Sequence, residues 1–181
     1  MTMKIVAVPK VLQELHGETA NLINIVLVYV IGIISAVLSL FELFPKNIES
    51  WKLILTFILF IDITGGVISN MTFATNEYYH KRPKLKKYFI VAHVIQPLLF
   101  SIMYFEYWSY MLFIYLFTMI ACFTLFKIKS SDIQRTISSS FLIIGIVVTS
   151  YFFKFNLLSI MVIGVLYMLK LILGFSVKKD A

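Results

Sequence analysis

Cysteine is almost absent from this chain of 181 residues, whose single thiol, Cys122, lies within an apolar run. One cysteine excludes a disulfide within the chain, a paired-thiol redox site and a cysteine-rich zinc site. An isolated cysteine in apolar surroundings most often behaves as a small buried hydrophobic residue. We therefore assign Cys122 no chemical role.

Charged residues are also scarce. They make up 14% of the chain, whereas 60% of the residues are hydrophobic and the mean hydropathy is +0.92. Soluble domains contain roughly 45–50% apolar and about 25% charged residues. The core of a water-soluble protein of this length cannot absorb such an excess of apolar side chains. The composition therefore predicts an integral membrane protein, with the bilayer as its solvent.

The residues that build common catalytic sites are few or missing. Neither a P-loop, a dinucleotide-binding glycine motif nor an H-E-x-x-H zinc motif occurs. Three histidines are too few for a membrane di-iron oxygenase, and one intramembrane acid is too few for a metal-dependent lipid phosphotransferase or prenyltransferase. The sequence thus predicts no metal site and no cofactor. Haem ligation by His80 and His93 is the one such arrangement that stays geometrically open.

Long apolar segments are what the chain does contain. A helix needs about 20 apolar residues to cross the hydrocarbon layer. The predicted fold class is all-α: a polytopic integral membrane bundle of six transmembrane helices (residues 22–177), between an N-terminal segment (1–21) and a short tail (178–181). Because only Lys154 and Asn156 separate the last two spans, a five-span alternative stays open. The six predicted spans are 22–44, 51–74, 88–105, 107–126, 136–153 and 155–175.

The basic residues are distributed unevenly around these spans. With six spans, twelve Lys and Arg residues fall on the side that holds both termini, and three fall on the other side. This positive-inside pattern predicts cytoplasmic termini. It also explains the net charge of +7 without nucleic acid as a partner. We expect a multi-pass protein of the plasma (inner) membrane, in contact with membrane lipid. Fourteen lysines against two arginines favour a bacterial source.

The N-terminal segment has mixed polarity. In the stretch VPKVLQELHGETANL, Val11, Leu12 and Leu15 share one face of a helix. This spacing predicts a short interfacial helix. We expect His16, in the same stretch, to be exposed.

The stretch FIDITGGVISN in the second span carries the one mid-span acid, Asp62. An ionised acid at the bilayer centre costs at least ~2.5–3.5 kcal/mol, so such residues face the bundle interior and are candidates for function. Gly65 and Gly66 follow it, and glycines permit close helix packing or leave room for a ligand. Packing is the favoured interpretation. The same helix side continues with further small or polar residues: Ser69, Asn70, Asn76 and His80.

The third span adds His93 and Gln96, which share a helix face, followed by Pro97. Proline removes a backbone donor, tends to kink the helix and frees nearby carbonyl groups. A short basic loop joins spans two and three, which predicts that they are antiparallel neighbours. Together they predict a polar column open to the cytoplasm, formed by Asp62, Ser69, Asn70, His93 and Gln96.

We assign candidate roles on this basis. Asp62 and His93 are the candidate acid–base or hydrogen-bonding residues at which catalysis would occur. The candidate substrate-binding residues are Ser69, Asn70, Asn76, His80, Arg82 and Gln96. Arg82 belongs to the basic loop HKRPKLKKY, whose cations set topology, attract anionic lipid, or capture a phosphate or carboxylate headgroup.

A purely structural role for the acid is the competing interpretation. Polar side chains hold membrane helices together with about 0.6–2 kcal/mol per bond. Protonated Asp62 would serve in this way by bonding a Ser, Thr or Gln, and ionised Asp62 would pair with Lys170 of the last span. Lys170 also lies near enough to the inner edge to extend its ammonium group to the interface.

Three functional hypotheses follow, and whether the protein is an enzyme stays open. In the first, the polar site binds or acts on a lipid or amphipathic small molecule from the cytoplasmic side. In the second, the protein is a proton- or cation-coupled transporter of small solutes, or a subunit of one. In the third, it is a structural or sensory subunit without a catalytic site. The sequence identifies neither an oligomeric state nor a protein partner.

Overall fold

A computed structural model describes residues 4–178 and contains six helical segments long and apolar enough to span a membrane. The predicted all-α, six-span fold is therefore confirmed, and the five-span alternative is wrong. The third and fifth spans begin five residues earlier than predicted. Pro83 occupies the first turn of one, and the Ser130 side chain caps the other by accepting from the Ile133 amide. The six segments are Leu22–Lys46, Ser50–Met71, Pro83–Met103, Phe105–Leu125, Ser131–Phe152 and Leu158–Phe175.

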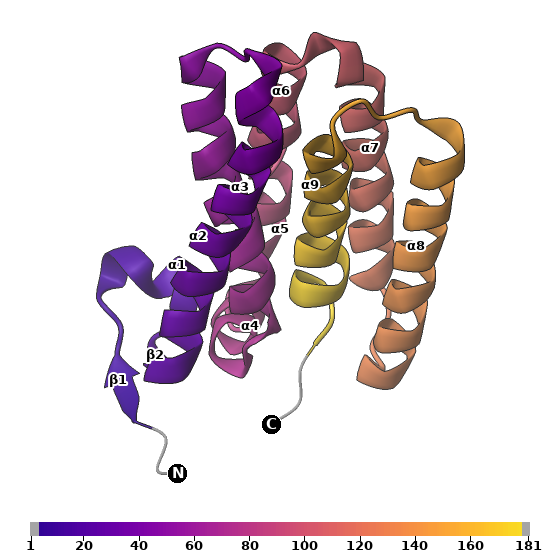
Figure 1. The fold of residues 1–181 in the computed structure, drawn as a ribbon. Helices are drawn as coiled ribbons and strands as arrows, with labels where there is room; N and C mark the ends of the chain where they lie inside the picture. Colours follow the sequence, from indigo (N-terminus) through magenta and orange to yellow (C-terminus); the bar gives the residue numbers. More distant parts are fainter. Residues whose placement is uncertain (1–3, 179–181) are drawn as a thin grey trace.

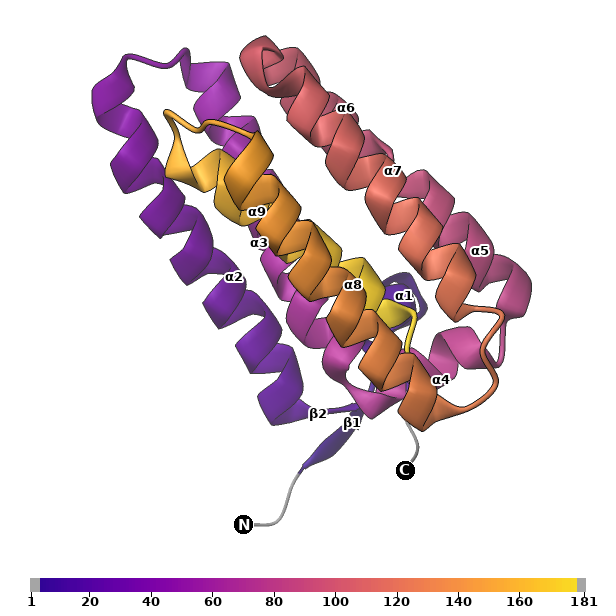
Figure 2. The same ribbon diagram turned by 90° about the vertical axis from the view of Figure 1, so that its right-hand side faces the viewer.

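The two termini lie at the same end of the bundle, called here the terminal end (Figure 1). The last span runs through the middle in both views (Figures 1 and 2) and is the most deeply buried of the six. The first and fifth spans bury least and form the edges. The elements of the spans are α2 (Leu22–Leu43), η2 (Phe44–Lys46), α3 (Ser50–Met71), α5 (Pro83–Ala92), α6 (Ile95–Met103), η3 (Phe105–Tyr107), α7 (Trp108–Leu125), α8 (Ser131–Phe152), α9 (Leu158–Met168) and η4 (Leu169–Phe175).

The N-terminal segment folds differently from the single interfacial helix expected. It is an antiparallel hairpin of β1 (Ile5–Ala7) and β2 (Thr19–Asn21), with Val6 opposite Ala20, and its tip holds the short turns η1 (Lys10–Leu12) and α1 (Gln13–His16). Gly17 stops α1 after one turn because its φ of +77° is not helical.

The hairpin packs against the bundle near α4 (Phe73–His80), and this placement corrects one expectation. His16 is 4% exposed rather than open to solvent, and its Nε2 lies 3.2 Å from the Tyr29 hydroxyl. A Cβ added to Gly17 would lie 2.5 Å from the Ala74 carbonyl oxygen. The close backbone approach at Gly17 thus carries the neighbouring imidazole into the protein.

Small residues bring α2 and α3 together. A Cβ on Gly65 would lie 3.1 Å from the Val28 carbonyl oxygen, and one on Gly32 would lie 3.1 Å from the Ile61 carbonyl oxygen. Both distances are tighter than ordinary van der Waals contact. The favoured packing interpretation is therefore correct for Gly65.

The third span is broken, as Pro97 predicts. The helix is interrupted at His93 and Val94, between α5 and α6. Because Pro97 has no N–H, the His93 carbonyl four residues earlier lacks its intrahelical donor. The Tyr167 hydroxyl on α9 donates to this carbonyl at 3.1 Å. A hydrogen bond from the last span thus satisfies the group that the proline leaves unpaired.

The last span changes geometry halfway along. After Met168 the α-helix widens into η4, a seven-residue π-helix. Such segments are rare and are frequent at functional sites. Lys170 lies in the first turn of η4, which packs directly against α3. Two irregular segments, the break in the third span and η4, therefore flank the middle of α3.

Candidate intramembrane binding site

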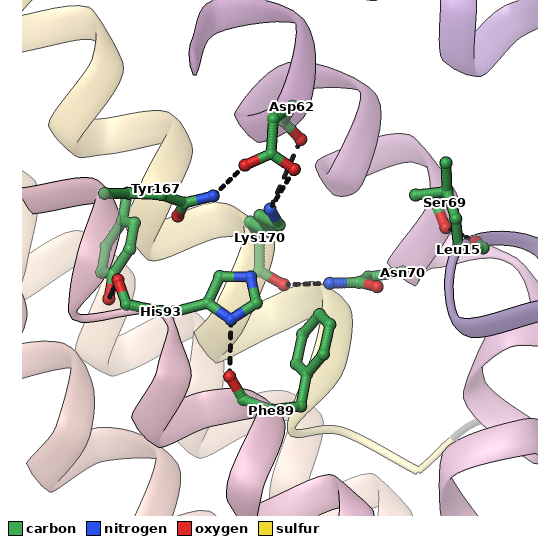
Figure 3. A network of polar contacts seen from close by, with 9 residues as sticks. Leu15, Asp62, Ser69, Asn70, Phe89, His93, Tyr167 and Lys170 are labelled. Carbon is green, nitrogen blue, oxygen red and sulfur yellow. Dashed lines mark hydrogen bonds and ion pairs between the residues drawn. The ribbon is translucent and has the colours of Figure 1, made fainter. Parts of the chain in front are cut away.

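An ion pair between the second and last spans lies at the centre of the site (Figure 3). The Lys170 Nζ lies 3.3 Å from Asp62 Oδ1 and 3.4 Å from the Asp62 backbone oxygen. The two side chains differ sharply in exposure: Lys170 is 3% exposed, whereas Asp62 is 48% exposed. The protein therefore encloses the amine completely and presents one side of the carboxylate to open space.

Gly66 makes room for the lysine. A Cβ at this position would lie 2.3 Å from Lys170 Cε and 2.8 Å from its Nζ. The two adjacent glycines of α3 thus have different functions. Gly65 packs against α2, and Gly66 leaves the space through which Lys170 reaches Asp62.

Gln96 supplies the second contact to the acid. Its Nε2 donates to Asp62 Oδ2, the oxygen that Lys170 does not contact. A carboxylate only accepts hydrogen bonds, so the amide must present its N–H₂ group to Asp62. The Gln96 Oε1 atom is left buried without a hydrogen-bond partner.

His93 is held in one tautomer. Its Nδ1 lies 2.6 Å from the Phe89 carbonyl oxygen, which accepts only, so Nδ1 carries a proton. In the neutral ring, Nε2 then keeps its lone pair. Figure 3 shows this second nitrogen on the side of the ring that faces Asp62 and Lys170. The imidazole therefore adds a hydrogen-bond acceptor to the site.

Asn70 supports the π-helix. Its Nδ2 donates to the Lys170 carbonyl oxygen at 3.1 Å. The wide turn of η4 changes the usual backbone pairing, and this side chain satisfies one of its carbonyl groups. Asn70 thereby fixes the backbone that carries the buried amine.

These groups border a cavity of about 650 Å³ between α3, the broken third span, η4 and the tip of the N-terminal hairpin. The volume falls within the ~300–1,000 Å³ typical of small-molecule sites. Most of its walls are apolar. The polar or charged lining residues are Glu14, Asp62, Asn70, His93, Gln96 and Lys170; the apolar and aromatic ones are Val11, Leu12, Leu15, Leu59, Leu85, Tyr88, Phe89, Ala92 and Ile95.

Four of the eight predicted site residues line this cavity: Asp62, Asn70, His93 and Gln96. Ser69, expected in the same polar column, lies elsewhere. Its hydroxyl donates to the Leu15 carbonyl oxygen, and Thr75 Oγ1 donates to the same oxygen at 2.8 Å. Ser69 anchors the N-terminal hairpin because the tip of that hairpin packs against the end of α3.

Three other predicted binding residues also lie outside the cavity lining. Asn76 Nδ2 donates to the Val177 carbonyl oxygen at 2.8 Å, and His80 Nδ1 lies 2.9 Å from the Asn76 carbonyl oxygen. The first contact links α4 to the chain just after the last span, and the second lies within α4. His80 and His93 thus face different groups, and the arrangement gives no support to the haem alternative.

Arg82 helps to attach the N-terminal hairpin to the bundle. Its guanidinium group lies 2.6 Å from Glu18 Oε1 and 4.0 Å from the centre of the Tyr78 ring. The hydrogen bond to Arg82 and its charge hold the pKa of Glu18 below its usual value. Because this cation already has a carboxylate partner, capture of a headgroup by Arg82 would have to displace Glu18.

Lys170 and Gly66 are the site residues for which the sequence predicted no role in the site. Lys170 was identified only as an alternative partner of the acid, although it is the sole cation that lies more than two residues inside a predicted span. A lone mid-span cation in a chain with a lone mid-span acid is the signal that identifies the pair. Among residues 4–178, no group of three His, Cys, Asp or Glu side chains is placed to hold a metal ion.

No known protein family matches this chain, and no curated protein or solved structure resembles it significantly. Any function therefore has to be argued from the geometry of the site itself.

Proposed function

We propose that the protein binds, or acts on, a lipid or other amphipathic small molecule in the cavity beside Asp62, which the molecule enters from the cytoplasmic side. The observation that carries this proposal is the half-exposed carboxylate of Asp62 at the polar end of a mostly apolar cavity. An amphipathic molecule matches both the polar carboxylate and the apolar walls. Its headgroup would meet Asp62, His93 and Gln96, and its chain would lie along the apolar walls.

The unequal exposure of the ion pair favours a binding site over a purely structural role. A pair that only holds helices together repays the desolvation of its charges only when the geometry is good and the remaining hydrogen-bonding groups are satisfied. Here the acid is open to the cavity, and the Gln96 oxygen beside it has no partner. A half-exposed carboxylate at a cavity surface is a group that a ligand can hydrogen-bond.

Proton- or cation-coupled transport is the second candidate, and one observation favours it. The ion pair lies between the break at His93 and the π-helix of the last span. Interrupted helices with ion sites near the middle of the membrane are features of secondary transporters. In this scheme, protonation of Asp62 would release Lys170, and the irregular segments would bend.

A pair of neighbouring substitutions tests the binding proposal. Ala92 lines the cavity, whereas the exposed Val91 beside it does not. Ala92→Phe fills the cavity, and Val91→Phe adds a similar ring outside it. Native mass spectrometry of protein purified in mild detergent should show co-purified amphipathic molecules on the wild type and on Val91→Phe, and fewer on Ala92→Phe. Equal occupancy of the two variants, or none on the wild type, would contradict the proposal.

The orientation of the protein in the membrane can be tested by labelling introduced cysteines, because the native Cys122 is buried. In a Cys122→Ala background, Lys84→Cys lies at the terminal end and Lys46→Cys at the opposite end. We expect a membrane-impermeant thiol reagent added outside intact bacterial cells to label Lys46→Cys and leave Lys84→Cys unlabelled until the membrane is permeabilised. The reverse pattern would place the termini outside and overturn the proposed cytoplasmic entry.

A further inference from the structure

We infer that the occupant of the cavity carries an uncharged headgroup that donates hydrogen bonds, as the hydroxyl group of a long-chain alcohol or an acylglycerol does. This inference rests on the proposed function and narrows it to one chemical class. Two independent features of the polar end support it: its charge balance and its distribution of donors and acceptors.

The charge at the polar end is already balanced. The Asp62 carboxylate is neutralised by Lys170, which is 3% exposed and cannot turn toward a ligand without leaving its enclosure. A charged headgroup would add a net charge to a site of low dielectric constant, where an uncompensated charge is costly. The ion pair therefore leaves no uncompensated charge at Asp62 for a charged headgroup to neutralise, and Glu14, the other acid of the lining, is itself exposed.

The rest of the lining offers an anion no alternative partner. Within the described residues, Glu14 on the hairpin is the other charged side chain that lines the cavity, and it is an acid. Three nearby cations have other partners: Arg82 bonds Glu18, Lys81 bonds Glu77, and the Lys86 ammonium lies over the rings of Phe126 and Phe175. Among the residues that line the cavity, a phosphate or carboxylate headgroup would meet two acids and no accessible amine.

The atoms that remain available at the polar end are acceptors. Asp62 uses one oxygen for Lys170 and the other for Gln96, and a carboxylate has about four lone-pair positions in all. The Gln96 Oε1 is buried without a partner. The His93 Nε2 keeps its lone pair because Nδ1 donates to Phe89. The accessible acceptors are thus the Asp62 carboxylate on the second span and His93 Nε2 on the third, and a hydroxyl headgroup is neutral and supplies the missing donor.

A matched series of probes on one 18-carbon chain tests this directly. The probes are oleyl alcohol, oleyl methyl ether, oleate and oleylamine, each titrated into the purified full-length protein in detergent and followed by native mass spectrometry. We expect the alcohol to bind best. The ether can accept but not donate, and the loss of one hydrogen bond to a buried acceptor predicts about tenfold weaker binding. Oleate and oleylamine should each bind at least as weakly as the ether.

A substitution of His93, one of the acceptors, provides a second measurement. His93→Phe keeps the ring and removes the Nε2 lone pair, so the preference for the alcohol over the ether should shrink several-fold. Ala92→Phe should weaken all four probes together, and Val91→Phe should weaken none. The comparison among probes on the wild-type protein stands even if His93→Phe fails to fold.

The outcomes separate the inference from the proposed function. Binding of oleate or oleylamine as tight as that of the alcohol, or an ether that matches the alcohol, would overturn the neutral-donor inference and leave the cavity a binding site. Failure of every probe to bind, together with no effect of Ala92→Phe on co-purified molecules, would overturn both.

Discussion

Lys170 reaches Asp62 directly across Gly66, and no side chain larger than hydrogen fits between them: a Cβ at Gly66 would lie 2.3 Å from the lysine Cε. The ion pair therefore depends on a residue that contributes no atom to it. The same relationship explains why a glycine lies one turn after Asp62.

The first prediction concerns this glycine. Gly66→Ala should push the Lys170 side chain aside and separate its ammonium group from Asp62. Breaking a buried pair is destabilising by about 3–5 kcal/mol, and because Asp62 is half exposed the lower end of this range applies. The melting temperature in detergent should fall clearly. In the Lys170→Ala background the same alanine should cost much less, because no side chain then reaches Gly66, and an equal loss would contradict the steric explanation.

The second prediction concerns the unequal exposure of Asp62 and Lys170 in the ion pair. Asp62→Asn leaves an enclosed ammonium group without its counter-charge, whereas Lys170→Met leaves a carboxylate that is still half exposed. Asp62→Asn should therefore lower the melting temperature more than Lys170→Met, and the double variant should recover part of the loss.

His93→Ala provides the matching control for function. Its ring contacts the Phe89 carbonyl and faces the cavity, so we expect a small change in melting temperature together with weaker ligand binding. A large loss of stability in both Asp62→Asn and His93→Ala would favour the purely structural hypothesis.

The third prediction concerns the end of the bundle opposite the termini. Glu42, near the end of α2, accepts hydrogen bonds from the backbone amides of Leu158 at 2.5 Å and Ser159 at 2.7 Å. It therefore caps the first turn of the last span from another helix. Glu42→Leu should destabilise the protein by about 1–3 kcal/mol. Glu49→Leu, which removes an exposed acid whose carboxylate contacts only Trp51 and Lys52 of the helix that follows it, should lower the melting temperature less; equal effects would exclude the capping role.

The fourth prediction is a pH dependence of the N-terminal hairpin. Burial lowers the pKa of His16 below the usual histidine value of about 6.5. When the hairpin is detached, the imidazole regains a pKa of about 6.5. As the pH falls through this value, the detached state gains a proton that the packed state does not, so packing weakens.

Hydrogen exchange of residues 5–21 measures this effect. Exchange protection in this segment should be lower at pH 5.5 than at pH 7.5, while protection in α9 stays constant. His16→Phe should remove the difference, because the substituted ring does not titrate. A pH effect of unchanged size in His16→Phe would assign it to another group.

The residues that could be placed from the sequence are those whose environment is set by distance along the chain. Long apolar runs determine the six spans, because each must satisfy its backbone hydrogen bonds within a helix. An even number of spans places both termini at one end. The break before Pro97 is also local, since the missing donor belongs to the carbonyl four residues earlier. Asp62, as the one mid-span acid, stood out for the same reason.

Contacts between helices were decided by the tertiary structure. The sequence offered Lys170 only as one of several partners for Asp62, and it could not place Ser69 against Leu15 or bury His16. Each of these contacts joins segments whose neighbours depend on how the spans pack. Apolar runs determine that a helix crosses the membrane, because the hydrocarbon layer stabilises every apolar helix of sufficient length. Which polar faces meet is decided by steric fit at positions such as Gly66, where a single missing side chain allows a lysine 104 residues away to enter.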